Sequence, residues 1–370
     1  MTIFARRIRT SILLCALLIS VQPLQASARA SSGTPAVANS GESGAARNGQ
    51  HDFDFHFGTW TTHILTLQAT GSGPATWVKM TGTVIDRKIW QGRANLEEIE
   101  AAGAGAHFQG FTLFLYNPKS HQWSQSFASK GSGTLGQPMI GEFRNGQGEL
   151  FGQESYQGRT VLARAIWSNI TPDSYHYQEA YSADGGKTWH LYFIAQLTRQ
   201  SQGVPEEAAQ SKGSEQGGLH GFDFNIGAWR TNISALDRPL KDPKSWVKFE
   251  GTHIVHRIWN GWADFGQLEI NGPTGHIEDL ALRLYNPQSR QWTVYIASSR
   301  SGVLGPPVIG EFKNGRGVFI GQDQFIGKTV LVRNVWSDIT ANSCHNEWAL
   351  SDDAGKTWTV YWIANDTRIE

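Results

Sequence analysis

Residues 51–199 and 220–368 of this chain align without a gap at a constant offset of 169. His51-Asp52-Phe53-Asp54-Phe55 returns as His220-Gly221-Phe222-Asp223-Phe224, and Tyr116-Asn117-Pro118 returns as Tyr285-Asn286-Pro287. A tandem duplication of this kind sets the domain count at two. It also gives an internal comparison, because every position of one copy has a counterpart in the other. A unit of this length is large enough to bury a core without disulfides.

Three segments lie outside the duplicated units. Residues 1–30 have a basic start, an apolar run too short to span a bilayer and small residues after it, which is the order of an export signal. We therefore expect a periplasmic or secreted protein with no stable membrane insertion once the signal is removed. Residues 31–50 and 200–219 are rich in small and polar types and poor in large apolar ones. They are expected to be a disordered leader and a flexible linker.

The composition limits the classes of partner. Lys plus Arg and Asp plus Glu are 32 each, so no broad basic field recruits nucleic acid. Of the two cysteines, Cys15 lies in the predicted signal, which leaves Cys344 as the single thiol and excludes internal disulfides. The 15 Trp and 41 Gly favour short strands, tight turns and a core built on large rings.

Each copy predicts a series of short strands and no helix of any length. Runs rich in β-branched and aromatic residues are separated by turn dipeptides such as Asn145-Gly146. In the first copy the expected strands are 59–68, 76–90, 93–101, 107–116, 121–129, 134–144, 147–156, 159–168, 174–182 and 188–199. A meander of this size avoids exposed edges by closing on itself. We therefore predict an all-β chain of two tandem antiparallel up-and-down β-barrels of about ten strands each.

Alternation along one strand suggests which face is turned inward. Phe111, Leu113 and Leu115 have apolar counterparts in the second copy, whereas Phe114 becomes Arg283. We expect the first three side chains inside the barrel and Phe114 on the solvent side. The interior of a small barrel is either filled by side chains or holds one small ligand.

The ends of each copy carry a family resemblance. Gly58-Thr59-Trp60 and Gly227-Ala228-Trp229 open the first strands, and Arg199 and Arg368 close the last ones. This pattern resembles the lipocalin-like, or calycin, group of β-barrels. The resemblance implies that each Trp plugs one end of its barrel and that the Arg lies across the indole ring, a cation–π arrangement.

The Phe-Asp-Phe-x-x-Gly-x-Trp opening and the Tyr-Asn-Pro turn look like an uncharacterised family of exported bacterial lipocalin-like proteins. The resemblance covers both copies almost entirely. It implies a fold more than a function, because such barrels serve as carriers, sensors, inhibitors and occasionally enzymes.

A second motif falls near the end of each copy. Residues 182–189 and 351–358 both fit Ser-x-Asp-x-Gly-x-Thr-Trp, which resembles the Asp-box of sialidases and related β-propellers. A propeller repeats such boxes at blade spacing, roughly every 40–50 residues. Here the two boxes are 169 residues apart, so we interpret them as structural hairpin turns.

A candidate ligand site comes from polar residues kept in both copies within predicted strands. They are Gln153, Arg164, His176 and Tyr192 in the first copy and Gln322, Arg333, His345 and Tyr361 in the second. If they point inward, they form a small polar cluster in an apolar cavity, the usual layout of a small-molecule site. The alternative is a buried hydrogen-bond network that binds nothing.

Metal binding and catalysis are not predicted. His51, Asp52, Asp54 and His56 lose two members in the second copy, where Gly221 and Asn225 replace Asp52 and His56.

The acidic residues Glu97, Glu98 and Glu100 are interpreted as a solvated rim. We name no catalytic residue and no cofactor, and the alternative is haem bound through His176 or His345. The expected function is binding of a small, largely apolar molecule inside the barrel. The alternatives are a structural module with filled barrels and an uncharacterised barrel enzyme.

Overall fold

The computed structural model describes residues 47–69, 75–103, 105–156, 158–200, 218–236, 239–240 and 245–369. The predicted signal, most of the predicted leader and residues 201–217 of the predicted linker lie outside these ranges. Within them, the regular elements are β-strands and short 3-10 helices. None of the helices in the described part of the chain is long and apolar enough to cross a membrane.

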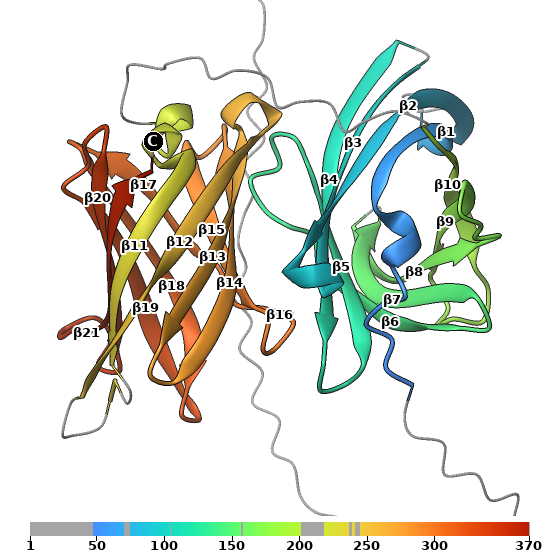
Figure 1. The fold of residues 1–370 in the computed structure, drawn as a ribbon. Helices are drawn as coiled ribbons and strands as arrows, with labels where there is room; N and C mark the ends of the chain where they lie inside the picture. Colours follow the sequence, from blue (N-terminus) through green and yellow to red (C-terminus); the bar gives the residue numbers. More distant parts are fainter. Residues whose placement is uncertain are drawn as a thin grey trace, which may run out of the picture. The chain divides into compact units, whose positions relative to one another are not determined.

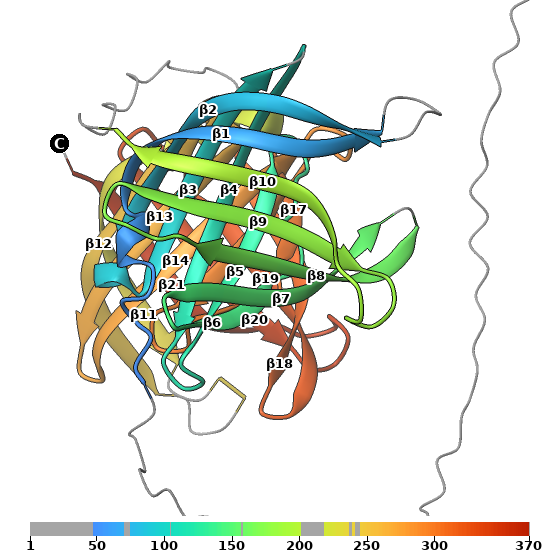
Figure 2. The same ribbon diagram turned by 90° about the vertical axis from the view of Figure 1, so that its right-hand side faces the viewer.

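The first copy folds into a closed antiparallel barrel, in the order β1-β10-β9-β8-β7-β6-β5-β4-β3-β2 (Figure 1). Figure 2 shows β1, β2, β9 and β10 running side by side along its wall. The strands are β1 (Gly58–Ala69), β2 (Ala75–Ile89), β3 (Ala94–Gly103), β4 (Ala106–Asn117), β5 (Gln122–Ser129), β6 (Met139–Arg144), β7 (Gln147–Tyr156), β8 (Arg159–Ser168), β9 (Ser174–Ser182) and β10 (His190–Arg199).

The second copy forms the same barrel, closed by pairing of β14 with β15. Its strands are β11 (Gly227–Leu236), β12 (Trp246–Ile258), β13 (Ala263–Gly272), β14 (Gly275–Asn286), β15 (Gln291–Ser298), β16 (Val303–Leu304), β17 (Val308–Lys313), β18 (Arg316–Phe325), β19 (Lys328–Ser337), β20 (Ser343–Ser351) and β21 (Thr359–Arg368). The short strand β16 pairs with β15 alone. The predicted fold, two tandem barrels of ten strands, is confirmed.

Tight turns set the meander. Asn145 and Gly146, between β6 and β7, both have positive φ, as do Asn314 and Gly315 in the second barrel. Two consecutive left-handed residues form the type I′ turn, whose twist matches that of the strands it joins. The Asn-Gly dipeptides seen in the sequence therefore act as hairpin turns.

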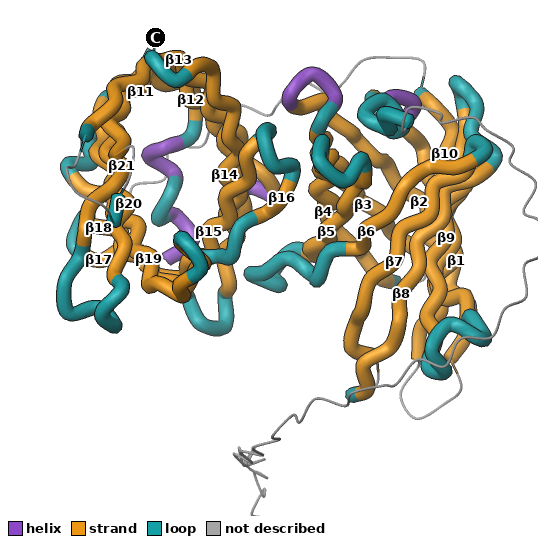
Figure 3. Tube along the Cα trace, turned by 90° about the horizontal axis from the view of Figure 1, so that it is seen from below, coloured by secondary structure: helices purple, strands orange, loops and turns teal. Residues whose placement is uncertain are grey.

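Short 3-10 helices precede and punctuate the strands. They are η1 (Asp54–His56), η2 (Trp90–Gly92), η3 (Gly218–His220), η4 (Asp223–Asn225) and η5 (Trp259–Gly261). Figure 3 shows the strands of the second barrel as a ring, with helical turns drawn in purple. Phe53, just before η1, and Phe222, just before η4, are buried in the barrel cores. The chain entering each barrel therefore supplies an aromatic plug.

The end of the predicted leader is part of the first barrel. The side chain of Arg47 donates to the carbonyl oxygen of Phe143 at 2.7 Å. The indole nitrogen of Trp123 donates to the carbonyl oxygen of Gly49 at 2.8 Å. Residues 47–50 thus make specific contacts that their composition did not suggest.

The face assigned to β4 is reversed. Phe114, expected on the solvent side, is 2% exposed, and its ring centroid lies 4.7 Å from that of Phe53 in the core. Its counterpart Arg283 is also buried. Phe111, Leu113 and Leu115 are buried in a separate apolar cluster outside the lumen. Both faces of this strand are apolar, so alternation alone could not tell inside from outside.

Candidate ligand-binding cavities

The first barrel encloses a cavity of about 390 Å³. Apolar side chains from β1, β2 and β10 form much of the lining, among them Ile64, Met80, Phe193 and Leu197. The polar side chains in the lining include His56, Glu97, Tyr175, Tyr177 and Glu179. The mixture is that of a small-molecule pocket, mostly apolar with a few polar groups that could fix an orientation.

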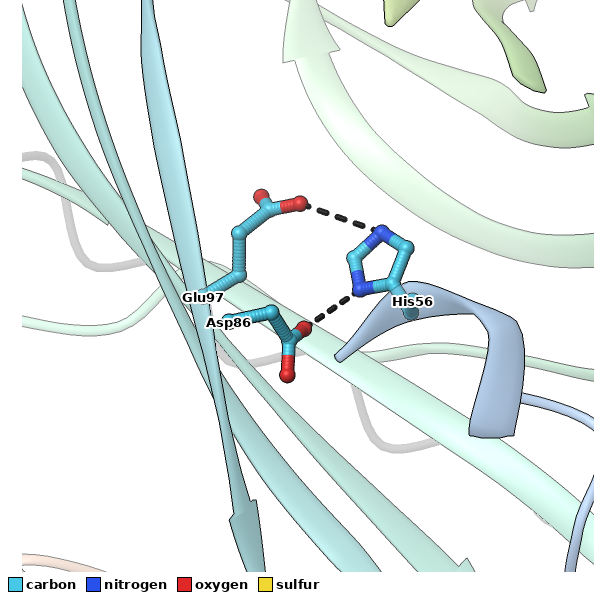
Figure 4. A group of neighbouring side chains, drawn as sticks. All are labelled: His56, Asp86 and Glu97. Carbon is cyan, nitrogen blue, oxygen red and sulfur yellow. Dashed lines mark hydrogen bonds and ion pairs between the residues drawn. The ribbon is translucent and has the colours of Figure 1, made fainter. Parts of the chain in front are cut away.

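One polar group lies where η1 approaches β2 and β3 (Figure 4). His56 Nδ1 is hydrogen-bonded to Asp86 Oδ2, and His56 Nε2 lies 3.2 Å from Glu97 Oε2. Asn95 Nδ2 also donates to Asp86 Oδ2, at 2.7 Å, and Thr112 Oγ1 donates to Glu97 Oε1 at 3.1 Å. These bonds hold the imidazole between two carboxylates.

Burial and charge oppose each other in this group. Burial alone lowers the pKa of His56, but the carboxylates of Asp86 and Glu97 outweigh it and the net pKa is raised. Burial raises the pKa of Glu97, with the His56 charge acting in the opposite direction. The imidazole is therefore stabilised in its protonated form, inside a cavity wall from which water is largely excluded.

A second polar group is built around Glu179 on β9. Tyr177 donates its hydroxyl to Glu179 Oε1, and Tyr192 donates to Glu179 Oε2 at 2.6 Å. Gln125 Nε2 donates to the Tyr177 hydroxyl at 3.2 Å. Burial raises the pKa of Glu179, although these two tyrosine hydrogen bonds lower it. Both carboxylate oxygens already have partners, so this group is a satisfied network.

The second barrel encloses a cavity of about 460 Å³ with different chemistry. Arg283 takes the place of Phe114 and is 1% exposed. Its Nη2 donates to Asn225 Oδ1 at 2.7 Å, and its Nε lies 3.3 Å from Asp264 Oδ1. Its guanidinium carbon also lies 4.3 Å from the centroid of the Phe222 ring. Burial raises the pKa of Asp264 to about 6, although the Arg283 charge acts to lower it.

The retained polar residues do not converge in the lumens as predicted. Arg164 is outside the first cavity, with its guanidinium 4.4 Å from the Trp189 ring and its Nη1 3.5 Å from Glu149 Oε1. Arg333 stacks on Trp358 in the same way, at 4.4 Å. Alternation along β8 explains this position, because Ala163, Ala165 and Trp167 occupy the inner face.

Of the retained glutamines and histidines, one lines a cavity. Gln153 is exposed on β7, whereas Gln322 lines the second cavity although it is exposed. His176 Nδ1 lies 3.4 Å from Ser168 Oγ, and His345 contacts Asn365 and Glu347. Neither histidine lines a cavity, so neither is placed to serve a haem bound in a lumen.

Tyr192 and Tyr361 do reach the interior, because each is the extra residue of a β-bulge. The register of β10 with β9 shifts between Leu191 and Phe193, and the pairing of β21 with β20 skips Tyr361. A bulge re-aims a side chain that simple alternation places elsewhere. Tyr192 thereby bonds Glu179, and Tyr361 lines the second cavity.

The predicted barrel-closing residues meet at the seam of each barrel. Trp60 pairs with Arg199 and Trp229 pairs with Arg368 in the strand register. The guanidinium carbons lie 4.0 and 4.1 Å from the respective ring centroids. Gly58 and Gly227 have φ of +118° and +115°, and a Cβ there would lie 2.8 and 2.7 Å from a guanidinium nitrogen. Glycine is therefore required at both positions.

The two Asp-box segments form hairpin turns, as interpreted. Asp184 Oδ1 accepts from the backbone N–H of Lys187 at 3.1 Å and of Thr188 at 2.9 Å, while Oδ2 accepts from Thr188 Oγ1 at 2.7 Å. These bonds, led by the Thr188 amide, lower the pKa of Asp184 to about 2. Asp353 holds the second turn through Thr357 in the same way.

Sequence reasoning missed the polar groups that do line the cavities. Tyr175 and Glu179 line the first cavity and Asp86 is buried against His56, yet none of the three is among the predicted site residues. Glu97 also lines the cavity, so its predicted place on a solvated rim is wrong. The predicted site residues are those kept in both copies, and this criterion excludes all four positions. The second copy has Val255 in place of Asp86, Gly266 in place of Glu97, Cys344 in place of Tyr175 and Trp348 in place of Glu179. The signal that could have identified these residues is divergence between the copies: an ionisable residue on an apolar strand in one copy is replaced by a different residue type in the other.

Comparison with known proteins gives one short family match. The BNR/Asp-box repeat matches residues 180–191, the turn that contains Asp184 and Trp189. No curated protein matches the chain.

Among solved structures, a DUF3598-family protein of unknown function from Nostoc punctiforme aligns at 8% identity, over 87% of this chain and 100% of its own, with a TM-score of 0.24. A double mutant of transferrin binding protein B from Haemophilus parasuis aligns at 8% identity, over 84% of this chain and 76% of its own, with a TM-score of 0.20. Pseudomonas putida OprB aligns at 7% identity, over 84% of this chain and 90% of its own, with a TM-score of 0.17. TM-scores this low carry no argument about function.

Proposed function

We propose that the chain is a binding protein whose barrels each hold a small, largely apolar molecule. The observation that carries this proposal is the pair of cavities, about 390 and 460 Å³, because both fall within the range typical of ligand pockets. Cavities of this size also argue against the alternative of a structural module with filled barrels. The candidate ligand-contacting residues are therefore those that line the lumens, in place of Arg164 and His176.

The linings favour different ligands in the two barrels. The first lumen presents the Glu97 carboxylate beside His56, so it suits an apolar molecule with a hydrogen-bond donor or a basic group. The second presents Arg283 and Asp366 among apolar side chains, with the buried Asp264 beside Arg283. Buried polar groups left without partners reject ligands that cannot satisfy them. We infer that one compound does not fill both sites equally well.

Obstruction of each lumen tests the proposal. Ala195 and Ala364 line the cavities, whereas their neighbours Gln196 and Asn365 are exposed on the outer face. Ala195→Phe and Ala364→Phe each fill space in one lumen. Gln196→Phe and Asn365→Phe add the same side chain outside and are the matched controls. The readouts are fluorescence of N-phenyl-1-naphthylamine and thermal melts with fatty acids, haem and aromatic amines.

The expected result is probe binding by the wild type that falls in the two alanine variants and persists in the two controls. If no compound raises the melting temperature and the probe stays dark, the binding proposal fails. If the outer-face variants lose the probe as completely as the inner-face ones, the cavities are not where it binds.

We also propose that the chain is exported, from the basic start and apolar run within residues 1–30. The intact mass of the protein recovered from the periplasm or medium tests this. The expected mass lacks the first 25–30 residues or so. A full-length mass with the protein retained in the cytoplasm would refute export.

A further inference from the structure

The buried group His56, Asp86 and Glu97 places one imidazole between two carboxyl groups. The side chains of His56 and Asp86 are 1% and 0% exposed, and that of Glu97 is 15% exposed. Ionisable groups in such a place are costly to desolvate unless they are fully partnered. Each of these residues offers a ligand atom, and the three atoms lie within 4.8 Å of one another.

Two polar atoms beside this group have no hydrogen-bond partner. Asp86 Oδ1 and the Tyr175 hydroxyl are both buried and unpaired, and the Tyr175 and His56 ring centroids are 5.1 Å apart. Buried polar atoms are nearly always satisfied by protein, water or an ion. The site is therefore incomplete with protein atoms alone, and its donor set of one imidazole and two carboxyl groups is one that a cation would satisfy.

The orientation of the imidazole matches a known pattern of metal ligation. His56 Nδ1 is held by Asp86, and Nε2 is the nitrogen that faces Glu97, which lines the cavity together with His56. In metal sites the ligating histidine typically donates its other N–H to a carboxylate, which fixes the tautomer. Imidazole nitrogen with carboxylate oxygen suits zinc and similar first-row ions.

We propose that the first barrel binds one divalent transition-metal ion through His56 Nε2 and the Glu97 carboxylate, with Asp86 orienting the imidazole. On binding, Nε2 gives up its proton to solvent and coordinates the ion, while Nδ1–H donates to Asp86. The charge of the ion then balances the two carboxylates. The remaining coordination positions face the cavity and are open to water or to a ligand held there. This inference does not depend on the apolar-ligand proposal.

The second barrel is an internal control. Asn225, Val255 and Gly266 occupy the positions of His56, Asp86 and Glu97, and none of them reproduces the ligand set. The proposal therefore requires one metal ion per chain, although the chain contains two barrels. Two equivalent ions per chain would contradict it.

The experiment uses full-length protein without a polyhistidine tag, stripped with a chelator and dialysed. Calorimetric titration with Zn²⁺ gives stoichiometry and affinity, and titration with Co²⁺ gives visible bands that report its coordination. We expect one equivalent bound. His56→Asn, which installs the residue of the second barrel, and Glu97→Gln should abolish binding. Asp86→Asn should weaken it by about 10–100-fold, as expected for a residue that orients a ligand.

His51→Asn is the matched control. His51 makes an exposed pair with Asp54 at 3.1 Å, so it is a histidine–carboxylate contact of the same kind without burial. Its removal should leave the affinity and the Co²⁺ spectrum unchanged. Far-UV circular dichroism checks that each variant is folded, and Glu97→Gln gives the decision if His56→Asn does not fold.

The proposal is overturned if stripped wild type takes up neither Zn²⁺ nor Co²⁺ at submillimolar concentration. It is also overturned if a folded Glu97→Gln or His56→Asn variant binds the ion as tightly as the wild type. A loss of binding in His51→Asn alone would move the site to the surface and refute the buried one.

Discussion

The guanidinium of Arg199 lies over the indole of Trp60, with 4.0 Å between its central carbon and the ring centroid. The same guanidinium donates to the backbone carbonyl oxygens of Phe55, Phe57 and Pro172, each at 2.7 Å. One side chain thus joins the entering segment, the first strand and the turn before β9. The contact closes the barrel at the point where its first and last strands meet.

Replacement of this arginine is expected to destabilise the first barrel. Arg199→Ala leaves three carbonyl oxygens without their donor and removes the cation–π contact, and we expect a loss of about 2–4 kcal/mol in the free energy of unfolding. Urea denaturation measures it. Arg144→Ala is the control, because that side chain is 80% exposed in its pair with Glu142 and should change little. Equal effects of the two substitutions would count against the seam as a stabilising element.

The buried Asp264, beside Arg283, predicts a pH dependence of stability. Burial raises its pKa from 3.8 to about 6 in the folded state, although the neighbouring Arg283 acts to lower it. Since the folded state holds this proton more tightly, the contribution to stability is complete below about pH 4 and is lost as the pH rises through about 6.

Asp264→Asn mimics the protonated form. The free energy of unfolding of this variant, relative to that of the wild type, should rise by on the order of 3 kcal/mol between pH 4 and 7. Denaturation curves at several pH values measure the difference. Parallel pH profiles for the two proteins would show that Asp264 does not titrate as described.

The Asp-box turn predicts a local effect on hydrogen exchange. Asp184→Ala removes the acceptor of the Lys187 and Thr188 amides, so their protection should fall while that of β9 persists. Exchange followed by mass spectrometry or nuclear magnetic resonance measures this. Asp352→Ala is the control, because Asp352 precedes the turn aspartate of the second box and pairs only loosely with Lys328, at 3.7 Å. Unchanged protection of the Lys187 and Thr188 amides in Asp184→Ala would show that Asp184 does not hold this turn.

Arg164 is expected to affect the turn that contains Trp189 without affecting the cavity. Arg164→Ala removes the stack on Trp189, so the indole should become more accessible to a fluorescence quencher. Binding of the apolar probe should stay the same, because Arg164 does not line the cavity. Arg333→Ala should act alike on Trp358. A large loss of probe binding in either variant would return these arginines to the ligand site.

The fold was largely predictable because its determinants are local. The turn dipeptides and strand-like runs gave ten strands per copy in the right order. The expected strand at 134–144 begins only at Met139, since Gly131 and Gly133 have positive φ and hold the preceding segment as a loop. The expected strand at 188–199 begins at His190, since Thr188 takes part in the Asp-box turn.

The direction of side chains was harder to predict, and so was the site. On β4 both faces are apolar, which removes the contrast on which alternation depends. On β10 the bulge at Tyr192 shifts the count by one. The retained Arg164 and Arg333 lie on the outer wall and stack on equivalent tryptophans, whereas the retained Tyr192 and Tyr361 reach the interior. The cavity linings differ between copies, so a search for retained residues passed over His56 with Asp86 and Arg283 with Asp264.

The divergence of the two interiors has a practical consequence for any assay of this chain. Under the proposed binding function, one polypeptide carries two unlike sites, and an assay of the whole molecule reports the sum of both. A stoichiometry of one ligand per chain is then an informative result, because it means that one of the two barrels binds the compound and not that half of the protein is inactive. Each cavity has to be blocked in turn before a ligand can be assigned to either barrel.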